Sequence, residues 1–175
     1  FLSVVPGVNE MGEETKLLKF DDKSASTNIT ADVPVKMNGD KVLIETKFKF
    51  VKTDDDYMSF GFDVMSGNQI MARVIQWSSG GTFNVYSSAG INTALTPGMP
   101  VPDTWYTLEI LLDKKAGTFD VQLQSEALVA AKITGAIKFD PKAGVSMLKG
   151  SSIYPESSGM TPNKFKIQTT SKRGE

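Results

Sequence analysis

Short runs in which apolar and polar residues alternate are the feature that most restricts how this chain can fold. In Lys41–Phe50, the clearest run, Val42 and Ile44 fall on one side, and Glu45 and Lys47 fall on the other. Because successive side chains of a β-strand point to opposite faces, this period of two predicts a strand with one buried and one solvated face. The 15 glycines and 8 prolines fall between such runs, which is typical of many short strands joined by turns.

One pair of alternating runs, residues 69–77 and 82–88, predicts an antiparallel hairpin. Ser78–Gly81 supplies the turn, and pairing Trp77 with Thr82 sets the register. On this register the core face carries Ile70, Ala72, Val74, Phe83 and Val85. The outer face carries Met71, Arg73, Ile75, Trp77, Thr82, Asn84 and Tyr86.

A second pair, residues 104–113 and 118–124, predicts another hairpin, in which Leu112 lies opposite Phe119. The inward side chains of this hairpin also include Leu108, Ile110, Val121 and Leu123. Its outward side chains are those of Trp105, Thr107, Glu109, Asp120, Gln122 and Gln124.

Further runs complete the prediction of an all-β chain. Residues 57–64 predict a strand in which Gly61 and Asp63 face outward, and residues 126–132 fit a short helix about as well as a strand at 128–133. Weaker strands are expected at residues 15–20, 27–33, 143–148 and 164–169. About ten to twelve strands with almost no helix predict a two-sheet antiparallel β-sandwich, or jelly roll. We expect one domain over residues 1–170, with residues 171–175 forming a linker or an added tail.

Composition excludes several classes of function. The chain of 175 residues has 19 Lys and Arg against 20 Asp and Glu, a net charge of -1, so it lacks the basic surplus that nucleic acid or an anionic membrane attracts. It contains no Cys and no His, which removes thiolate chemistry, Ser-His-Asp catalysis and the commonest zinc ligands. No apolar run approaches the roughly 20 residues that cross a bilayer.

Three segments carry a resemblance to a known family. They are Lys16–Asp22, the hairpin of Asp103–Asp113 with Gly117–Leu123, and Thr161–Gln168. In this order they resemble the concanavalin A-like lectin/glucanase jelly rolls, and in particular modules of secreted bacterial polysaccharide-degrading enzymes. The resemblance implies a jelly-roll fold, a carbohydrate-related function and a secreted or cell-surface location. Because this fold hosts lectins, glycosidases, lyases and adhesins, it does not choose among them.

The outer face of the first hairpin holds the main candidate site for carbohydrate. Sugars stack their C–H faces on flat aromatic rings, while polar side chains bond their hydroxyls. We expect Trp77 and Tyr86 to stack and Arg73 and Asn84 to select, with Arg73 favouring an acidic, uronate-containing glycan. The alternative is that Trp77 only covers the end of the sheet beneath a loop.

Two other groups of polar residues are weaker candidates. Glu109 and Gln122 belong to a strip on the second hairpin that either bonds sugar hydroxyls or is a solvated face. Nearby Trp105 is expected to be partly buried and structural. Asp21 and Asp22 resemble the acidic strand end that often holds a structural calcium ion in this fold, although no cofactor is required.

An enzyme remains an alternative. A glycosidase on this fold needs two carboxylates, yet no predicted strand carries two outward acids two residues apart. The lyases of this fold usually carry a histidine after Gln-Ile, but here Gln69 and Ile70 are followed by Met71. Arg73 and Tyr86 would have to supply the base and the charge neutralisation that a lyase needs.

The sequence therefore predicts a non-catalytic carbohydrate-binding module, lectin-like, of a larger secreted bacterial enzyme. Its expected partners are a polysaccharide or oligosaccharide and the neighbouring domains of the parent enzyme, and the isolated domain is expected to be monomeric. One alternative is a structural, interdomain or adhesin domain, favoured by the outward apolar residues Leu43, Ile75 and Leu111. The other is a histidine-independent polysaccharide lyase or glycoside hydrolase.

Overall fold

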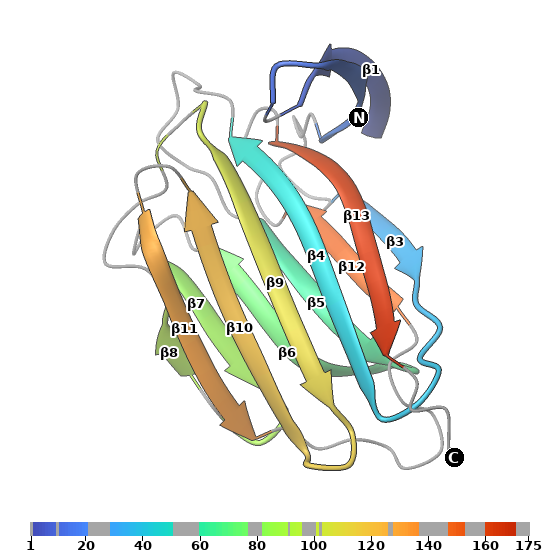
Figure 1. The fold of residues 1–175 in the computed structure, drawn as a ribbon, viewed down its shortest axis with the longest axis vertical. Coiled ribbons are helices and arrows are strands. Elements are labelled where there is room, and N and C mark those ends of the chain that lie inside the picture. The colour runs from blue at the N-terminus through green and yellow to red at the C-terminus, as the bar shows by residue number, and fades with distance from the viewer. Residues whose placement is uncertain are drawn as a thin grey trace.

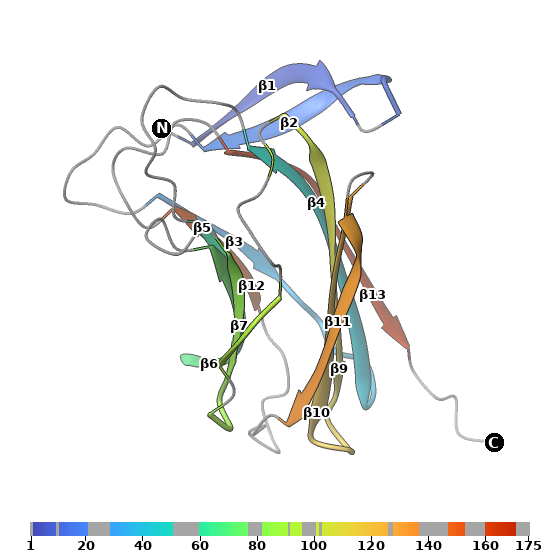
Figure 2. The same cartoon turned by 90° about the vertical axis from the view of Figure 1, so that its left-hand side faces the viewer.

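Two antiparallel β-sheets packed face to face form the protein in a computed structural model (Figures 1 and 2). The structure describes residues 2–9, 11–20, 29–50, 60–76, 82–90, 92–95, 101, 103–125, 128–136, 147–152 and 160–170. These residues are strands, turns and connecting segments, and they include no helix long and apolar enough to cross a membrane. The predicted all-β sandwich is thus confirmed.

Each sheet has a defined strand order. The seven-stranded sheet runs β1 (Leu2–Val8), β2 (Glu14–Phe20), β13 (Met160–Thr170), β4 (Lys41–Phe50), β9 (Trp105–Asp113), β10 (Thr118–Ser125) and β11 (Leu128–Ala136). The six-stranded sheet runs β3 (Thr30–Pro34), β12 (Met147–Ser152), β5 (Phe60–Ser66), β6 (Gln69–Gln76), β7 (Phe83–Ser87) and β8 (Asn92–Ala94). In Figure 2 the β1–β2 hairpin lies across one end of the sandwich.

The core lies between the sheets and takes one face of β4, β9 and β10 from one sheet and of β5, β6 and β7 from the other. On β4, Val42, Ile44 and Phe48 have no exposed surface, as their alternation predicts. The Phe48 ring lies 5.3 Å from that of Phe62 and 5.7 Å from that of Phe83, both in the opposite sheet, and stacks on Tyr106 at 5.6 Å. Phe48 therefore joins the two layers at the centre of the core.

Both predicted hairpin registers are confirmed. β6 pairs with β7 so that Arg73 lies opposite Tyr86, and the same offset places Gln76 opposite Phe83. β9 pairs with β10 with Leu112 opposite Phe119. The complementary apolar residues of two neighbouring runs were sufficient to predict each register, because a slip of one residue would turn the buried side chains of a strand outward.

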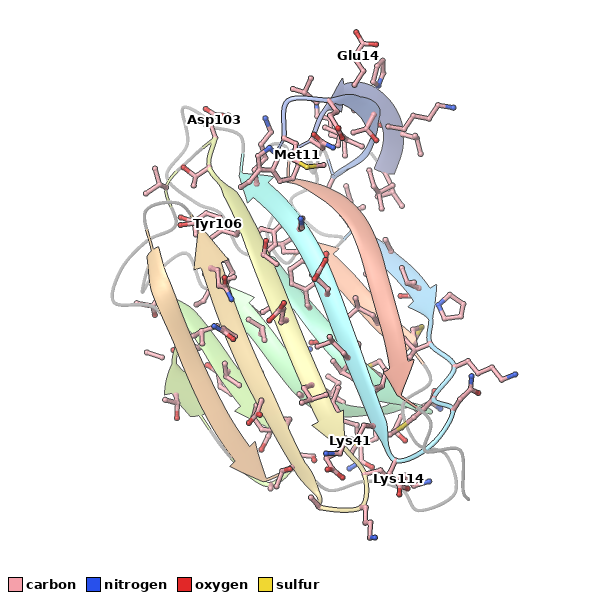
Figure 3. The ribbon with its side chains drawn as sticks, in the orientation of Figure 1. Met11, Glu14, Lys41, Asp103, Tyr106 and Lys114 are labelled. Carbon is pink, nitrogen blue, oxygen red and sulfur yellow. The ribbon has the colours of Figure 1, made fainter. Side chains whose placement is uncertain are left out.

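The turn between β9 and β10 is fixed by Asp113. Its Oδ1 accepts a hydrogen bond from the backbone N–H of Ala116 at 2.8 Å, and its Oδ2 lies 3.1 Å from the Lys41 ammonium. Figure 3 shows Lys41 beside this turn, at the start of β4. The Ala116 N–H, followed by Lys41, lowers the pKa of the Asp113 carboxyl. The β9–β10 hairpin is thereby also tied to β4.

Other expectations were wrong in part. Residues 128–136 form strand β11, paired with β10, so the helix at 126–132 is excluded over the described part of that segment. Strands β1 and β8 were not predicted. Ile70, expected in the core, is 36% exposed. Gly61, Asp63, Met71 and Ile75, expected to face outward, are buried on the outward side of their sheet.

Thr46 is a polar residue on the core face of β4, and it supports our first prediction. It is 1% exposed, and its Oγ1 has no hydrogen-bond partner among the residues that the structure describes. A buried hydroxyl without a partner costs roughly 1–3 kcal/mol. We expect Thr46→Val to raise the free energy of unfolding by about 1 kcal/mol in urea denaturation, because valine keeps the shape and removes the hydroxyl. Thr46→Ser, which keeps the hydroxyl and removes the methyl, should lower it; equal stabilities for all three proteins would contradict the prediction.

Candidate functional site

A row of polar side chains crosses the outward face of the six-stranded sheet. In register, from one strand to the next, it consists of Asp32 on β3, Lys149 on β12, Asp63 on β5, Arg73 on β6 and Tyr86 on β7. Side chains directly opposite each other on paired strands are within interaction distance. The row alternates in charge and contains two acids and two bases, so its formal charges cancel. We call these five residues the charged row.

Asp63 and Arg73 form a two-pronged ion pair at the centre of this row. Arg73 Nε donates to Asp63 Oδ1 at 2.6 Å, and Arg73 Nη2 donates to Asp63 Oδ2 at 2.8 Å. Bidentate guanidinium–carboxylate pairs are among the strongest polar contacts in proteins and hold both groups in one orientation. The hydrogen bond to Asp63 raises the pKa of Arg73, so the guanidinium remains charged. The ion pair is partly buried. Asp63 is 5% exposed, whereas the Arg73 side chain is 33% exposed.

An open pocket lies beside the ion pair. It measures about 280 Å³ and is lined by Ile70, Arg73, Tyr86, Ser87 and Ser88. The backbone N–H of Ser88 donates to the carbonyl of Met71 at 2.9 Å, which keeps the end of β7 against β6 after the regular ladder stops. The pocket thus combines an aromatic ring, a guanidinium, an aliphatic side chain and two hydroxyl-bearing residues, the mixture that suits a sugar ring.

A close contact between β5 and β6 supports the sheet beneath the charged row. Gly61 lies opposite Ile75, and a Cβ atom added at Gly61 would lie 3.2 Å from Ile75 Cγ1 and 3.2 Å from the carbonyl oxygen of Val74. Ile75 is fully buried, so it packs closely over the glycine. This packing removes Ile75 from the outward apolar surface that would have favoured an interdomain role.

Asn84 lies on the same sheet face but does not line the pocket. It is the register partner of Ile75, one row away from the Arg73–Tyr86 pair. Its Nδ2 donates to the Oγ1 of Thr82 at 3.2 Å and to the Thr82 carbonyl at 3.3 Å. The amide donors of Asn84 are thus directed at the start of its own strand, and its expected role in selecting a sugar stays a prediction.

Glu109 and Gln122 lie on the other sheet. They are register partners on β9 and β10 and are half-buried on the outward face of the seven-stranded sheet. The two outward faces point in opposite directions (Figure 2), so one ligand site cannot contain both this pair and Arg73 with Tyr86. Glu109 and Gln122, the second strip of candidates, are therefore separated from the pocket, because the two hairpins belong to different sheets.

A pair of carboxylates also lies on that second face. Glu45 of β4 is directly opposite Glu109 of β9, an arrangement that a search for two acids along a single strand cannot find. Retaining glycosidases hold two carboxyl groups on either side of the substrate bond within a cleft. Figure 2 shows the seven-stranded sheet bending over at its upper end, so its outward face is convex there.

Three predicted site residues lie outside the described residues. They are Trp77, Asp21 and Asp22. In the described ranges, no three acidic residues come close enough together to hold a metal ion, and calcium at Asp21 and Asp22 stays a prediction. Trp105 is described: it is half-buried, and the Lys49 ammonium lies 5.5 Å from its ring centroid, in agreement with the expected partial burial.

Solved structures with the same architecture come from proteins related to carbohydrates. The catalytic domain of a glycoside hydrolase family 131 protein from Coprinopsis cinerea is similar with a TM-score of 0.64 and 12% identity, over 89% of this chain and 70% of that one. A legume lectin-like domain from Entamoeba histolytica gives 0.60 and 9%, over 97% and 89%. The lectin UEA-II complexed with galactose gives 0.58 and 11%, over 96% and 91%. The fold is a concanavalin A-like jelly roll.

The concanavalin A-like fold confirms the architecture that the three sequence segments imply. No model of a known protein family matches the sequence, and neither does any curated protein. At identities of 9% and 12% the similarity shows the fold alone, so no functional residue is transferred from these structures. The candidate site of this jelly roll rests on its own residues, with Asp63, Arg73 and Tyr86 at its centre.

Proposed function

We propose that this domain binds carbohydrate without catalysis, in the pocket beside Arg73 and Tyr86 on the outward face of the six-stranded sheet. The observation that carries the proposal is the pocket itself, in which an aromatic residue and an oriented guanidinium stand side by side. The likeness of the fold to a glycoside hydrolase, a lectin-like domain and a galactose-bound lectin supports it.

The pocket favours binding over chemistry. Asp63, which is paired with Arg73 beside the pocket, has both carboxylate oxygens engaged by Arg73 and is almost fully buried. A general acid or base must reach the proton that it transfers, and a carboxylate held in this way is poorly placed to do so. We further propose that the domain serves as an accessory module that holds a secreted parent enzyme at its polysaccharide, where even modest affinity raises the local concentration.

Tyr86 provides the sharpest test. In affinity electrophoresis against neutral and acidic plant, algal and bacterial polysaccharides, we expect the wild type to bind at least one polymer. Tyr86→Ala should weaken this binding tenfold or more, which corresponds to about 1.4 kcal/mol, because the stacking surface is lost. Tyr86→Phe keeps the ring and should retain most of the binding.

Gln122→Ala is the matched control on the other sheet. Under the proposal it leaves binding unchanged, since Gln122 lies on the opposite outward face. If Gln122→Ala abolishes binding and Tyr86→Ala does not, the binding site lies on the seven-stranded sheet, which contradicts the proposal. Release of soluble sugar in the same samples would instead establish an enzyme.

A specific observation favours a second candidate, a docking domain. Leu2, Val4, Val8 and Met11 on the β1–β2 hairpin are 41%, 66%, 46% and 69% exposed. An apolar surface of this kind is typical of an interface with another domain. If the wild type binds none of the polysaccharides, a docking function is favoured over carbohydrate binding.

A further inference from the structure

We infer that the pocket takes an uncharged sugar, and that Asp63 is the residue that excludes acidic ones. This inference rests on the proposed carbohydrate binding and names the class of glycan. It reverses the preference expected from the sequence, where Arg73 alone suggested a uronate.

The guanidinium of Arg73 already has an anionic partner. An unpaired arginine offers a carboxylate two parallel N–H donors and a full positive charge. In this protein the Nε and Nη2 donors of Arg73 are already bonded to a carboxylate of the chain itself. A glycan carboxylate at the remaining edge of the guanidinium would therefore be a second anion on one cation.

The charged groups around the Asp63–Arg73 pair also compensate one another. Asp63 is flanked on its other side by Lys149, and Lys149 is flanked in turn by Asp32. Every base in the charged row thus has an acid directly opposite it on a paired strand. No surplus positive charge is left in this row to compensate a uronate. Because Asp63 is 5% exposed, water screens its carboxylate poorly, and its repulsion of a bound anion is correspondingly strong.

The pocket still offers a neutral sugar a hydrogen-bond donor and an apolar surface. The Nη1 group of Arg73 is outside the fork to Asp63, and it donates without needing a charged partner. Hydroxyl groups of a neutral sugar accept such bonds, and Ile70 and Tyr86 supply the surface for its C–H face. The volume of about 280 Å³ is at the small end for ligand pockets, which run from roughly 300 to 1,000 Å³. One sugar unit of a longer neutral chain is the expected occupant.

The experiment compares neutral and acidic polymers with the complete chain. Neutral β-glucan, galactan and mannan are tested beside polygalacturonate and alginate at low salt, where electrostatic effects are greatest. We expect the wild type to bind at least one neutral polymer and to bind both acidic polymers at least tenfold more weakly. Preference for an acidic polymer, lost in Tyr86→Ala, would overturn this inference and leave the proposed function standing. Absence of all binding would overturn both.

Asp63→Asn tests the role assigned to the carboxylate. It keeps a side chain of the same shape and removes the negative charge, so Arg73 becomes an uncompensated cation. We expect the ratio of acidic to neutral binding to rise tenfold or more, and the gained binding to disappear at high salt. Glu45→Gln is the matched control, because it removes one negative charge from the domain on the other sheet, away from the charged row; its ratio should change less than threefold.

An unchanged ratio in Asp63→Asn, with a thermal melt that shows a folded protein, would overturn the role of Asp63. Should Asp63→Asn fail to fold, the wild-type comparison of neutral and acidic polymers still decides the inference. Equal gains in Asp63→Asn and Glu45→Gln would show that only the overall charge of the domain matters, which also overturns the inference.

Discussion

Replacing Phe48 by alanine is expected to lower the free energy of unfolding by about 3–5 kcal/mol. Phe48 has no exposed surface, and its ring touches aromatic rings from both sheets, those of Phe62, Phe83 and Tyr106. The truncation removes buried apolar area and leaves a cavity where the layers meet, which the surrounding strands cannot close. Urea denaturation followed by circular dichroism measures the loss.

Leu43→Ala is the control for this experiment. Leu43 lies on the same strand but on its outward face, where it is half-buried, and its truncation is expected to cost about 1 kcal/mol or less. A cost for Phe48→Ala no larger than that of Leu43→Ala would mean that the sheets do not pack through Phe48.

Arg73→Ala should remove about 3 kcal/mol of stability at neutral pH as well as glycan binding. Breaking a buried ion pair by deleting one partner costs roughly 3–5 kcal/mol, because the remaining charge is left without compensation. We expect the lower end because the Arg73 side chain is 33% exposed. Urea denaturation of wild type and variant at pH 7 measures the loss of stability, and affinity electrophoresis measures the loss of binding.

A double variant separates the charge from the lost packing. If the uncompensated carboxylate causes the instability, Arg73→Ala with Asp63→Asn should be more stable than Arg73→Ala alone in urea denaturation at pH 7. A double variant that is less stable than either single variant would show that the cost comes from packing of the arginine stem.

The alternation of apolar and polar residues along the chain was sufficient to predict most of the strands. It identified the core faces of β4, β9 and β10 and the registers of two hairpins, because a buried face specifies register strongly. It failed for β1, in which Pro6 and Gly7 resemble a loop. A strand at the edge of a sheet tolerates such residues, since it pairs on one side only. Residues 126–132 were undecided until pairing with β10 made residues 128–136 a strand.

Part of the candidate site was also contained in the sequence. Arg73 and Tyr86 were predicted as neighbours on one outward face, and the structure places them opposite each other beside the pocket. The sequence did not determine that Glu109 and Gln122, on the second hairpin, lie in the opposite sheet, because membership of a sheet depends on pairing between strands distant in the chain. For the same reason, the pairing of Glu45 with Glu109 became visible only in the folded protein.

Local sequence therefore determined which residues alternate and which hairpins form, whereas the partner of Arg73 was decided by the tertiary structure alone. At the β5–β6 turn, Ser66 pairs with Gln69 and Met65 with Ile70, and continuing that register would place Asp63 opposite Ala72, whose side chain faces the core. The register shifts by one residue between Val64 and Met65, so that Asp63 meets Arg73 on the outward face. A β-bulge adds one residue to one strand of a pair and thereby changes which side chains meet beyond it. No alternation within a single strand encodes it, and it determines the ion pair at the centre of the proposed site.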